Sequence, residues 1–374
     1  MIDLLQVRNE NFEIIGIIDT AKSVIWHKKY YGVGDFEIYA QATEQHVDLL
    51  RRDKYVTRIN DDEIGIIEKV EISENAQDGL MIIASGRFAK SIFDRRIIYT
   101  LSGKQNSATV IRGNVESGAR ALVANNAISC AFNSKRNIPV LQLGAHSGST
   151  KIIVDGSGQA TQKQVTNDNL LTYTDALLQE YEMSAKIVLS ANEFKLDYKC
   201  FEGIDRSVDN SNGLDCIVFS SDFDNLTDSD YLTDETTVKN MALIGGEGEG
   251  LDRFYSSIER SETGLARREM FVDASNIQQK YKDDQDQEQT YTDSEYKAML
   301  DSRGKLQLAQ MVRVESFSGT INTAFGSWRL GIDYALGDIV TIQNNKIGIY
   351  ANVRITETTE VQDENGYSVS LNYE

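Results

Sequence analysis

Near its end the chain reads Gly337-Asp338-Ile339-Val340-Thr341-Ile342, then Asn344-Asn345, Ile347-Gly348-Ile349 and Val353-Arg354-Ile355. Near its start it reads Asp53-Lys54-Tyr55-Val56-Thr57-Arg58-Ile59, then Asn60-Asp61-Asp62, Ile64-Gly65-Ile66 and Val70-Glu71-Ile72. Both stretches run Asp, Val-Thr, an Asn/Asp-rich turn, Ile-Gly-Ile and Val-x-Ile. We interpret them as two copies of one unit, so the sequence predicts two related β-domains in one chain.

The residue types in each copy are typical of strands and turns. Val56-Thr57 and Val340-Thr341 are β-branched and suit a pleated surface. Gly65 and Gly348 are expected inside strands, where a glycine marks a bulge or a close approach of another chain segment. A third strand should follow each copy after Asp78-Gly79 and Asn365-Gly366, which are strong hairpin signals. The alternative is a chance likeness between two ordinary hairpins.

Composition excludes several classes of protein. A length of 374 residues is typical of two to four domains. A net charge of -19 argues against a surface that grips nucleic acid, because such a surface needs clustered Lys and Arg. We expect no membrane span and no secretory signal, since there is no run of 18 apolar residues and no basic N-terminal region. Cys130, Cys200 and Cys216 lack metal-site spacing and are expected to be buried in a reducing compartment.

The pattern along the chain predicts a β-rich α+β fold. Residues 1–104 read as the first β-domain, completed by 196–235, and residues 105–195 as an inserted α/β domain with two amphipathic helices. Residues 236–275 and 311–374 read as the second β-domain. Residues 276–310 read as a helical insertion, with a capping box at Thr292 and Glu295.

Three glycine-containing stretches resemble known binding or catalytic loops but lack residues that those loops need. The loop Gly245-Gly246-Glu247-Gly248-Glu249-Gly250 has Leu251 where a dinucleotide loop needs glycine, and its glutamates would repel phosphate. Gly103-Lys104 lacks the other residues of a P-loop. Gly144-Ala145-His146-Ser147-Gly148 places its serine one residue late for a nucleophile elbow.

The histidines and acidic residues predict no reactive centre. His27, His46 and His146 are far apart in the sequence, although a triad built from distant residues stays open. The tract Asp222–Asp234 has Leu226, Thr227 and Thr233 where an EF-hand needs other residues, so we expect a solvated acidic loop, with a looser calcium site as the alternative. We assign no catalytic, cofactor-binding or metal-binding residue.

Several short motifs, in order, resemble those of siphophage tail-hub proteins. In the first half they are Trp26, the run Tyr31-Gly32-Val33-Gly34-Asp35-Phe36-Glu37-Ile38, Gly65-Ile66-Ile67, Gly86-Arg87 and Arg95-Arg96-Ile97-Ile98. In the second half they are Asn240-Met241-Ala242, Arg268-Glu269-Met270-Phe271-Val272-Asp273, Tyr334-Ala335-Leu336-Gly337-Asp338-Ile339-Val340 and Arg354-Ile355-Thr356-Glu357. The family is similar in fold to the baseplate hub of contractile-tailed phages.

The resemblance implies two tube-like β-domains per chain and a homotrimeric ring whose six β-domains imitate a hexameric tail tube. Such a ring joins a distal tail protein or tail-tube protein on one face to a tail-tip, spike or fibre protein on the other. It leaves a channel through which DNA passes without specific binding, and it implies a virion protein assembled in the bacterial cytoplasm that is not an enzyme and needs no cofactor. The alternatives are a tail-associated cell-wall hydrolase and a module that binds host glycans, the latter suggested by 17 Tyr and two Trp.

Overall fold

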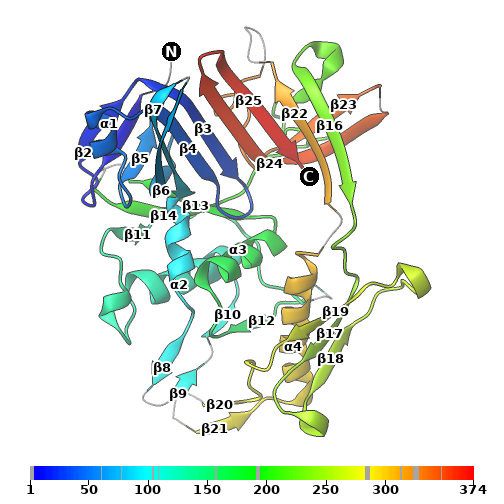
Figure 1. Ribbon diagram of the computed structural model, residues 1–374. Helices are drawn as coiled ribbons and strands as arrows, with labels where there is room; N and C mark the ends of the chain where they lie inside the picture. Colours follow the sequence, from blue (N-terminus) through cyan, green and yellow to red (C-terminus); the bar gives the residue numbers. More distant parts are fainter. Residues whose placement is uncertain are drawn as a thin grey trace.

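A computed structural model describes most of the chain (Figure 1). The described residues are 4–59, 61–76, 78–102, 105–107, 109–155, 158–190, 194–282, 287–311, 314–322, 328–346 and 348–374. One large sheet fills one end of the molecule, and two smaller mixed regions lie at the other end (Figure 1).

Thirteen strands of the described chain form the large sheet. Its path runs β16-β22-β25-β24-β3-β4-β7-β6-β5-β1-β2, and β23 pairs with both β24 and β15. The strands are β1 (Leu5–Arg8), β2 (Ile14–Ile18), β3 (Ala21–Lys29), β4 (Asp35–Gln41), β5 (Tyr55–Arg58), β6 (Ile64–Asn75), β7 (Gly79–Phe88), β15 (Val218–Ser220), β16 (Leu226–Asp234), β22 (Val314–Ile321), β23 (Ile339–Asn344), β24 (Ile349–Asp363) and β25 (Gly366–Tyr373).

One order of antiparallel pairing occurs twice in this sheet. The strands β3-β4-β7-β6-β5 are neighbours in that order, and so are β16-β22-β25-β24-β23. The registers agree as well. Phe36 lies opposite Trp26 and Gly86, and Phe317 lies opposite Tyr231 and Tyr373. At the far side of each set, Val56 faces Gly65 and Val340 faces Val353.

β-bulges recur at equivalent positions of the two sets. Glu68 is the extra residue in the pairing of β6 with β7, and Thr356 is the extra residue in the pairing of β24 with β25. A second bulge falls at Lys22 in β3 and at Thr227 in β16. Because a bulge bends its strand and increases the local twist, the two sets are curved at the same points.

The sequence repeat agrees with these registers at its first strand and at the hairpin before its third strand, but not at Ile-Gly-Ile or at Val-x-Ile, where Val70 is the counterpart of Thr358 and not of Val353. The alignment of Val56 with Val340 and of Gly79 with Gly366 is confirmed, and both glycines begin the third strand. The prediction for Gly348 is wrong. Gly65 lies inside β6 as predicted, but Gly348 lies in the turn before β24 with φ +71. The structural counterpart of Gly65 is Val353, because β24 is three residues longer than β6.

Each strand set buries an aromatic core. The ring of Trp26 lies 5.3 Å from that of Phe36 and 4.9 Å from that of Phe88, and helix α1 (Glu44–Leu49) adds Leu49 to this core. In the second set, the core is built around Phe219, whose ring contacts Tyr334 and Tyr373. Aromatic pairs of this kind add stability beyond the apolar area that they bury.

Residues 89–201 form a mixed α/β region below the first strand set (Figure 1). Helices α2 (Val115–Val123) and α3 (Leu170–Glu180) share one buried core with the sheet β11-β14-β13, and the side chain of Asn114 caps α2. The other elements are the 3₁₀ helix η1 (Ala89–Arg95), the π-turn η2 (Ala124–Ile128), the 3₁₀ helix η3 (Ser134–Arg136), β8 (Thr100–Ser102), β9 (Gln105–Ser107), β10 (Thr109–Arg112), β11 (Leu141–Leu143), β12 (Gln162–Val165), β13 (Ser184–Leu189) and β14 (Leu196–Phe201).

A second small region holds helix α4 (Asp293–Leu308), which begins at the predicted Thr292–Glu295 capping box. Tyr296, Met299 and Leu300 of α4 are buried against a three-stranded sheet, β18-β17-β19. The remaining elements of the chain are β17 (Met241–Gly245), β18 (Tyr255–Ile258), β19 (Glu269–Asp273), β20 (Lys280–Lys282), β21 (Glu288–Thr290) and the 3₁₀ helices η4 (Ser221–Phe223), η5 (Gly250–Asp252) and η6 (Gly264–Ala266).

Two segments pair differently from the assignment made from the sequence. Strands within 236–275, expected to join the second β-domain, form their own sheet, because the apolar face of α4 needs a partner and they cover it. Residues 196–235 are expected to complete the first β-domain, but their strands pair in two other parts of the structure. β14 pairs with β13, and β16 pairs with β22 of the second strand set.

Candidate interaction surface

The two strand sets are joined edge to edge within the chain. The second half of β24 pairs with β3, from Glu357 opposite Lys29 to Asp363 opposite Ser23. The backbone N–H of Tyr30 extends this ladder, since it donates to the carbonyl of Thr356 at 2.7 Å. One sheet surface therefore continues from the first set into the second without a break.

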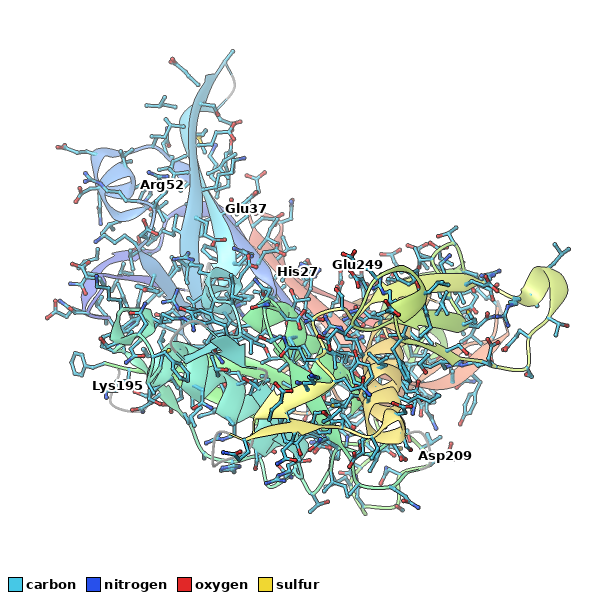
Figure 2. The ribbon with its side chains drawn as sticks, turned by 90° about the horizontal axis from the view of Figure 1, so that it is seen from below. His27, Glu37, Arg52, Lys195, Asp209 and Glu249 are labelled. Carbon is cyan, nitrogen blue, oxygen red and sulfur yellow. The ribbon has the colours of Figure 1, made fainter. Side chains whose placement is uncertain are left out.

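Successive side chains of a strand point to opposite faces of a sheet, and here the two faces differ in character. One face carries the aromatic cores. The other is polar, and His27 and Glu37 of this face are labelled in Figure 2. We call it the polar face, and its polar members are Ser23, His27, Lys29, Asp35, Glu37, Tyr39, Gln41, Lys69, Glu71, Ser73, Ser85, Arg87, Asp228, Asp230, Asp234, Ser318, Thr320, Glu357, Thr359, Asp363, Ser368, Ser370 and Asn372.

The polar face carries more acidic than basic side chains. Its carboxylates are Asp35, Glu37, Glu71, Asp228, Asp230, Asp234, Glu357 and Asp363, whereas its Lys and Arg residues are Lys29, Lys69 and Arg87. The basic residues are engaged locally. Lys29 lies 3.3 Å from Glu357, Lys69 lies 3.2 Å from Glu71, and Arg87 pairs with Glu68 at 2.8 Å. The uncompensated charge of this face is negative.

His27 and Glu357 lie at the junction of the two strand sets. Nε2 of His27 lies 3.4 Å from Glu357, and Nδ1 lies 3.2 Å from Asp35. The hydrogen bond to Glu357 raises the pKa of His27, and the same hydrogen bond lowers the pKa of Glu357 to about 2. This pairing stabilises contacts between β3, β4 and β24.

Beneath the junction, charged groups are buried on the core side of the sheet. Arg58 Nη2 donates to Glu360 at 2.6 Å, and the hydroxyl of Tyr367 donates to the same carboxylate. Lys28 pairs with Asp61 at 2.8 Å. Breaking one partner of a buried ion pair is costly, so the pair between Arg58 of β5 and Glu360 of β24 holds the two strand sets in one arrangement, whereas the Lys28–Asp61 pair lies within the first set.

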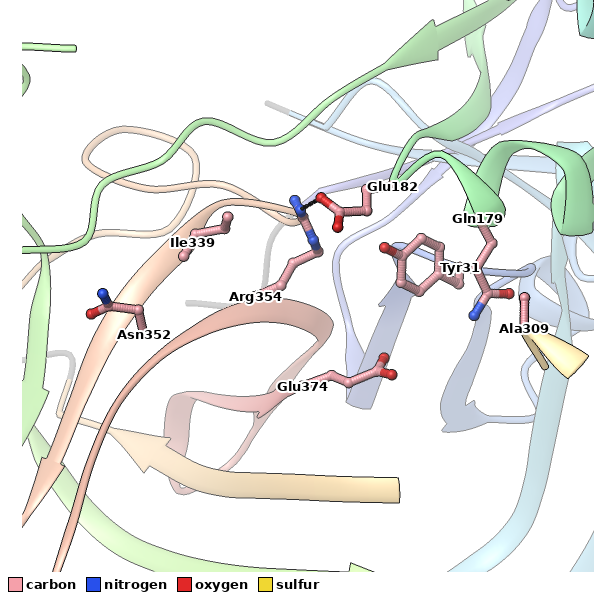
Figure 3. A pocket seen from close by; sticks show the side chains of 8 residues that line it. All are labelled: Tyr31, Gln179, Glu182, Ala309, Ile339, Asn352, Arg354 and Glu374. Atoms are coloured by element: carbon pink, nitrogen blue, oxygen red, sulfur yellow. Dashed lines mark hydrogen bonds and ion pairs between the residues drawn. The ribbon is translucent and has the colours of Figure 1, made fainter. Parts of the chain in front are cut away.

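A cleft of about 360 Å³ opens beside the same junction (Figure 3). Arg354 of β24 crosses it, donating to Glu182 at 3.0 Å and to the carbonyl of Gly337 at 2.7 Å. Burial raises the pKa of both Tyr31 and Glu374, which line the cleft. Arg354 is therefore already paired with groups of this chain. We interpret the cleft as a gap left where α3, β3 and β24 pack together.

The loop Gly245–Gly250 is held by hydrogen bonds within the chain. The hydroxyl of Tyr296 accepts from the backbone N–H of Glu247 at 2.7 Å, and the carboxylate of Glu247 accepts from the backbone N–H of Gln279 at 3.0 Å. Arg253 donates to the carbonyl of Gly246 at 3.1 Å. These contacts tie the loop to α4, to Gln279 and to the segment that leads into β18. Gly103 and Lys104 lie outside the described residues.

The three histidines lie on separate elements. His46 of α1 contacts the carbonyl of Gln41 at 2.7 Å, whereas His146 lies 3.4 Å from Glu116. Ser147 donates to the carboxylate of Glu116 at 2.6 Å rather than to a histidine. A triad needs the serine hydroxyl to donate to the imidazole, and this geometry does not provide that.

The acidic tract Asp222–Asp234 is mostly strand, so the prediction of a solvated loop is wrong. β16 begins at Leu226 and pairs with β22 along its length. Asp228 and Asp230 thereby join the polar face. Over the described ranges, no group of three His, Cys, Asp or Glu residues is placed to hold a metal ion.

The remaining sequence predictions concern cysteines and membrane spans. Cys130 and Cys200 are buried as predicted, whereas Cys216 is exposed, contrary to prediction. No helix in the described parts of the chain has the length and apolar character needed to cross a bilayer. The sequence does not reveal the polar face, because its strands lie far apart along the chain and only their pairing, as of Asp363 with Ser23, places them together.

Comparisons with known proteins agree with this architecture. The tail protein from Neisseria meningitidis MC58 has a TM-score of 0.56 at 12% identity, with 100% of this chain and 96% of that chain covered. The 43 kDa tail protein of prophage MuSo2 from Shewanella oneidensis has a TM-score of 0.53 at 11% identity, with 100% and 98% covered. A search of curated proteins finds no match.

A family model matches the chain from residue 4 to residue 372, and its description is siphovirus ReqiPepy6 Gp37-like protein. This match confirms the resemblance to siphophage tail proteins that the sequence motifs indicated. The chain therefore belongs to the siphovirus ReqiPepy6 Gp37-like protein family, and its fold is that of phage tail proteins.

Proposed function

We propose that this protein is a tail hub, of which three copies form a ring that joins a sixfold tail tube to a threefold tail tip. The observation that carries the proposal is the repeated strand set, with its matching order, registers and paired bulges. Two equivalent tube-like units in each of three chains supply six units around the ring. The same ring has true threefold symmetry, so it can contact partners of either symmetry.

The two tube-like units of the proposal follow the strand pairing. The first consists of β1 to β7, and the second consists of β15, β16 and β22 to β25. The regions 89–201 and 236–311 are insertions, and both lie at the same end of the large sheet (Figure 1). The partners of the ring are a distal tail or tail-tube protein on one face and a tip, spike or fibre protein on the other.

In this proposal the polar face lines the channel of the ring. Its carboxylates outnumber its Lys and Arg residues, and all three of the latter, Lys29, Lys69 and Arg87, are paired with neighbouring carboxylates. A surface of this kind repels the phosphates of DNA. Genomic DNA can then pass without being held, and the role is structural rather than catalytic.

The test is the mass and symmetry of the full chain in solution. Mass photometry should find a species of three chains, each of 41.9 kDa, and averaged electron-microscope images should show a ring with six similar lobes. A chain that remains monomeric at high concentration, with or without a tail-tube partner, contradicts the proposal. Release of fragments from purified cell walls by the wild-type chain would favour a hydrolase instead.

A further inference from the structure

We propose that the outer edge of β6, from Lys69 to Asn75, pairs antiparallel with β16 of a second copy of this chain, with Ile72 opposite Tyr231. This inference rests on the proposed ring and names the strands that close it. Within the described chain, residues 69–75 of β6 have β7 as a neighbour on one side only, and β16 has β22 on one side only. Such edges present backbone N–H and C=O groups to a further strand.

The junction inside the chain provides the template for this contact. There, β24 of the second strand set pairs with β3 of the first. By their registers, β6 in the first set corresponds to β24 in the second, and β16 in the second set corresponds to β3 in the first. A contact between two copies that has the geometry of the β24–β3 contact therefore joins β6 of one copy to β16 of the next. Thr356 and Glu68 are equivalent bulges, and Trp26 is equivalent to Tyr231. Glu360 opposite Trp26 therefore becomes Ile72 opposite Tyr231 of the next copy.

The exposed fractions of the side chains at the internal junction and at the two outer edges support this correspondence. At the internal junction, Trp26 is 0% exposed and Glu360 is 6% exposed. Their counterparts at the outer edges are 45% exposed for Tyr231 and 47% exposed for Ile72. Both outer side chains lie on the core side of the sheet, so the proposed pairing would continue the apolar core from one copy into the next.

The charges along the two edges select one register. With Ile72 opposite Tyr231, Lys69 lies opposite Asp234, and the acidic Glu71 and Glu74 lie opposite Leu232 and Ser229. A shift by one residue in either direction places Glu74 opposite Asp228 or Asp230. A shift by two residues places Glu71 opposite Asp230 or Asp234. Like charges directly opposite each other destabilise a sheet, so every nearby register is disfavoured.

Cysteine cross-linking tests the strands and the register together. At the internal junction Tyr30 and Thr356 form a hydrogen-bonded pair, so by the alternation of the ladder Ile25 and Val361 form a non-hydrogen-bonded pair. Their counterparts in the proposed contact are Asp230 and Ser73. Side chains of a non-hydrogen-bonded pair approach most closely. The exposed Cys216 is first replaced by serine. The variant Ser73→Cys with Asp230→Cys, treated with oxidised glutathione, should then give covalent dimers and trimers on a non-reducing gel.

The matched control carries Ser73→Cys with Ser229→Cys, in which the second thiol is shifted by one residue and points to the opposite face. It should give at least tenfold less covalent trimer. A trimer in mass photometry without cross-linking of the designed pair, or with equal cross-linking of the control, overturns the β6–β16 contact while the hub proposal stands. A chain that never assembles overturns both.

A substitution at the edge provides an independent measurement. Ile72→Asp places a carboxylate in the proposed apolar contact and should convert the trimer to monomer without a change in the circular dichroism spectrum. Ile152→Asp is the control, because Ile152 is 46% exposed and lies far from either edge. Retention of the trimer by Ile72→Asp, or its loss in both variants, contradicts the proposed edge.

Discussion

At the scale of single residues, Glu63 joins the large sheet to the region below it. Its backbone bridges to Val188 of β13, and its backbone N–H donates to Asp61 at 3.0 Å. Burial raises the pKa of the Glu63 carboxyl from 4.5 to about 7, with Lys28 acting in the opposite direction. The folded chain therefore holds this proton more tightly than the unfolded chain does.

The raised pKa of Glu63 predicts a pH-dependent stability. Below about pH 4.5 the carboxyl is neutral in both states, and the favourable contribution is complete; it is lost as the pH rises through about 7. Glu63→Gln, which stays neutral, should therefore gain stability over the wild type between pH 5 and pH 8, by up to about 3 kcal/mol. Melting temperatures at both pH values measure this.

The control for that prediction is Glu249→Gln, which removes one negative charge at an exposed site (Figure 2). If the wild type and Glu63→Gln differ by the same amount at pH 5 and pH 8, the carboxyl of Glu63 does not change its protonation on folding as proposed. The difference in stability between the two proteins would then come from side-chain packing alone.

At the scale of strands, Gly65 illustrates how close packing depends on register. A Cβ at this position would lie 2.4 Å from Cε1 of Phe36, whose ring is fixed against Trp26. Gly65→Ala should therefore lower the free energy of unfolding by about 1–3 kcal/mol. The companion change Phe36→Leu, which removes the ring, should restore part of the loss.

Urea unfolding followed by the fluorescence of Trp26 measures the effect, in a background in which Trp328 is replaced by phenylalanine. Gly319→Ala is not a suitable control, because its Cβ would also clash. Gly118→Ala is better, since Gly118, like Gly65, has no positive φ and its added Cβ would come no closer than 3.6 Å to a neighbouring atom. A loss in Gly118→Ala as large as that in Gly65→Ala would contradict the clash with Phe36.

Strands also show where sequence reasoning succeeded and where it failed. Val340-Thr341 and Asn365-Gly366 could be matched to their first copies because β-branched pairs and hairpin glycines are local signals. β16 was missed because Leu226–Asp234 is rich in Asp, Ser and Thr, and only its pairing with β22 makes it a strand. The mismatch at Gly348 arose because a turn glycine and a strand glycine have the same identity in sequence but different conformations.

At the scale of the whole molecule, the sign of the charge on the polar face should decide whether the proposed ring binds DNA. Glu37 of β4 and Ser370 of β25 lie on this face in the first and second strand sets. The variant Glu37→Lys with Ser370→Lys adds three positive charges per chain there. We expect it to retain short double-stranded DNA at low salt, whereas the wild type should not.

The salt dependence of DNA binding, compared with that of a control variant, tests whether the new lysines on the polar face contact the DNA. Each lysine that contacts a phosphate should add about 0.9 to the magnitude of the slope of log K against log salt, so two new lysines in each of three chains should give a steep dependence. The control Glu249→Lys with Ser211→Lys changes the net charge by the same amount at exposed sites off the polar face. Equal retention by the two variants, measured by fluorescence anisotropy, would mean that net charge alone attracts DNA. In the proposed channel the new lysines surround the duplex from all sides, so the proposal requires that the polar-face variant alone retain DNA.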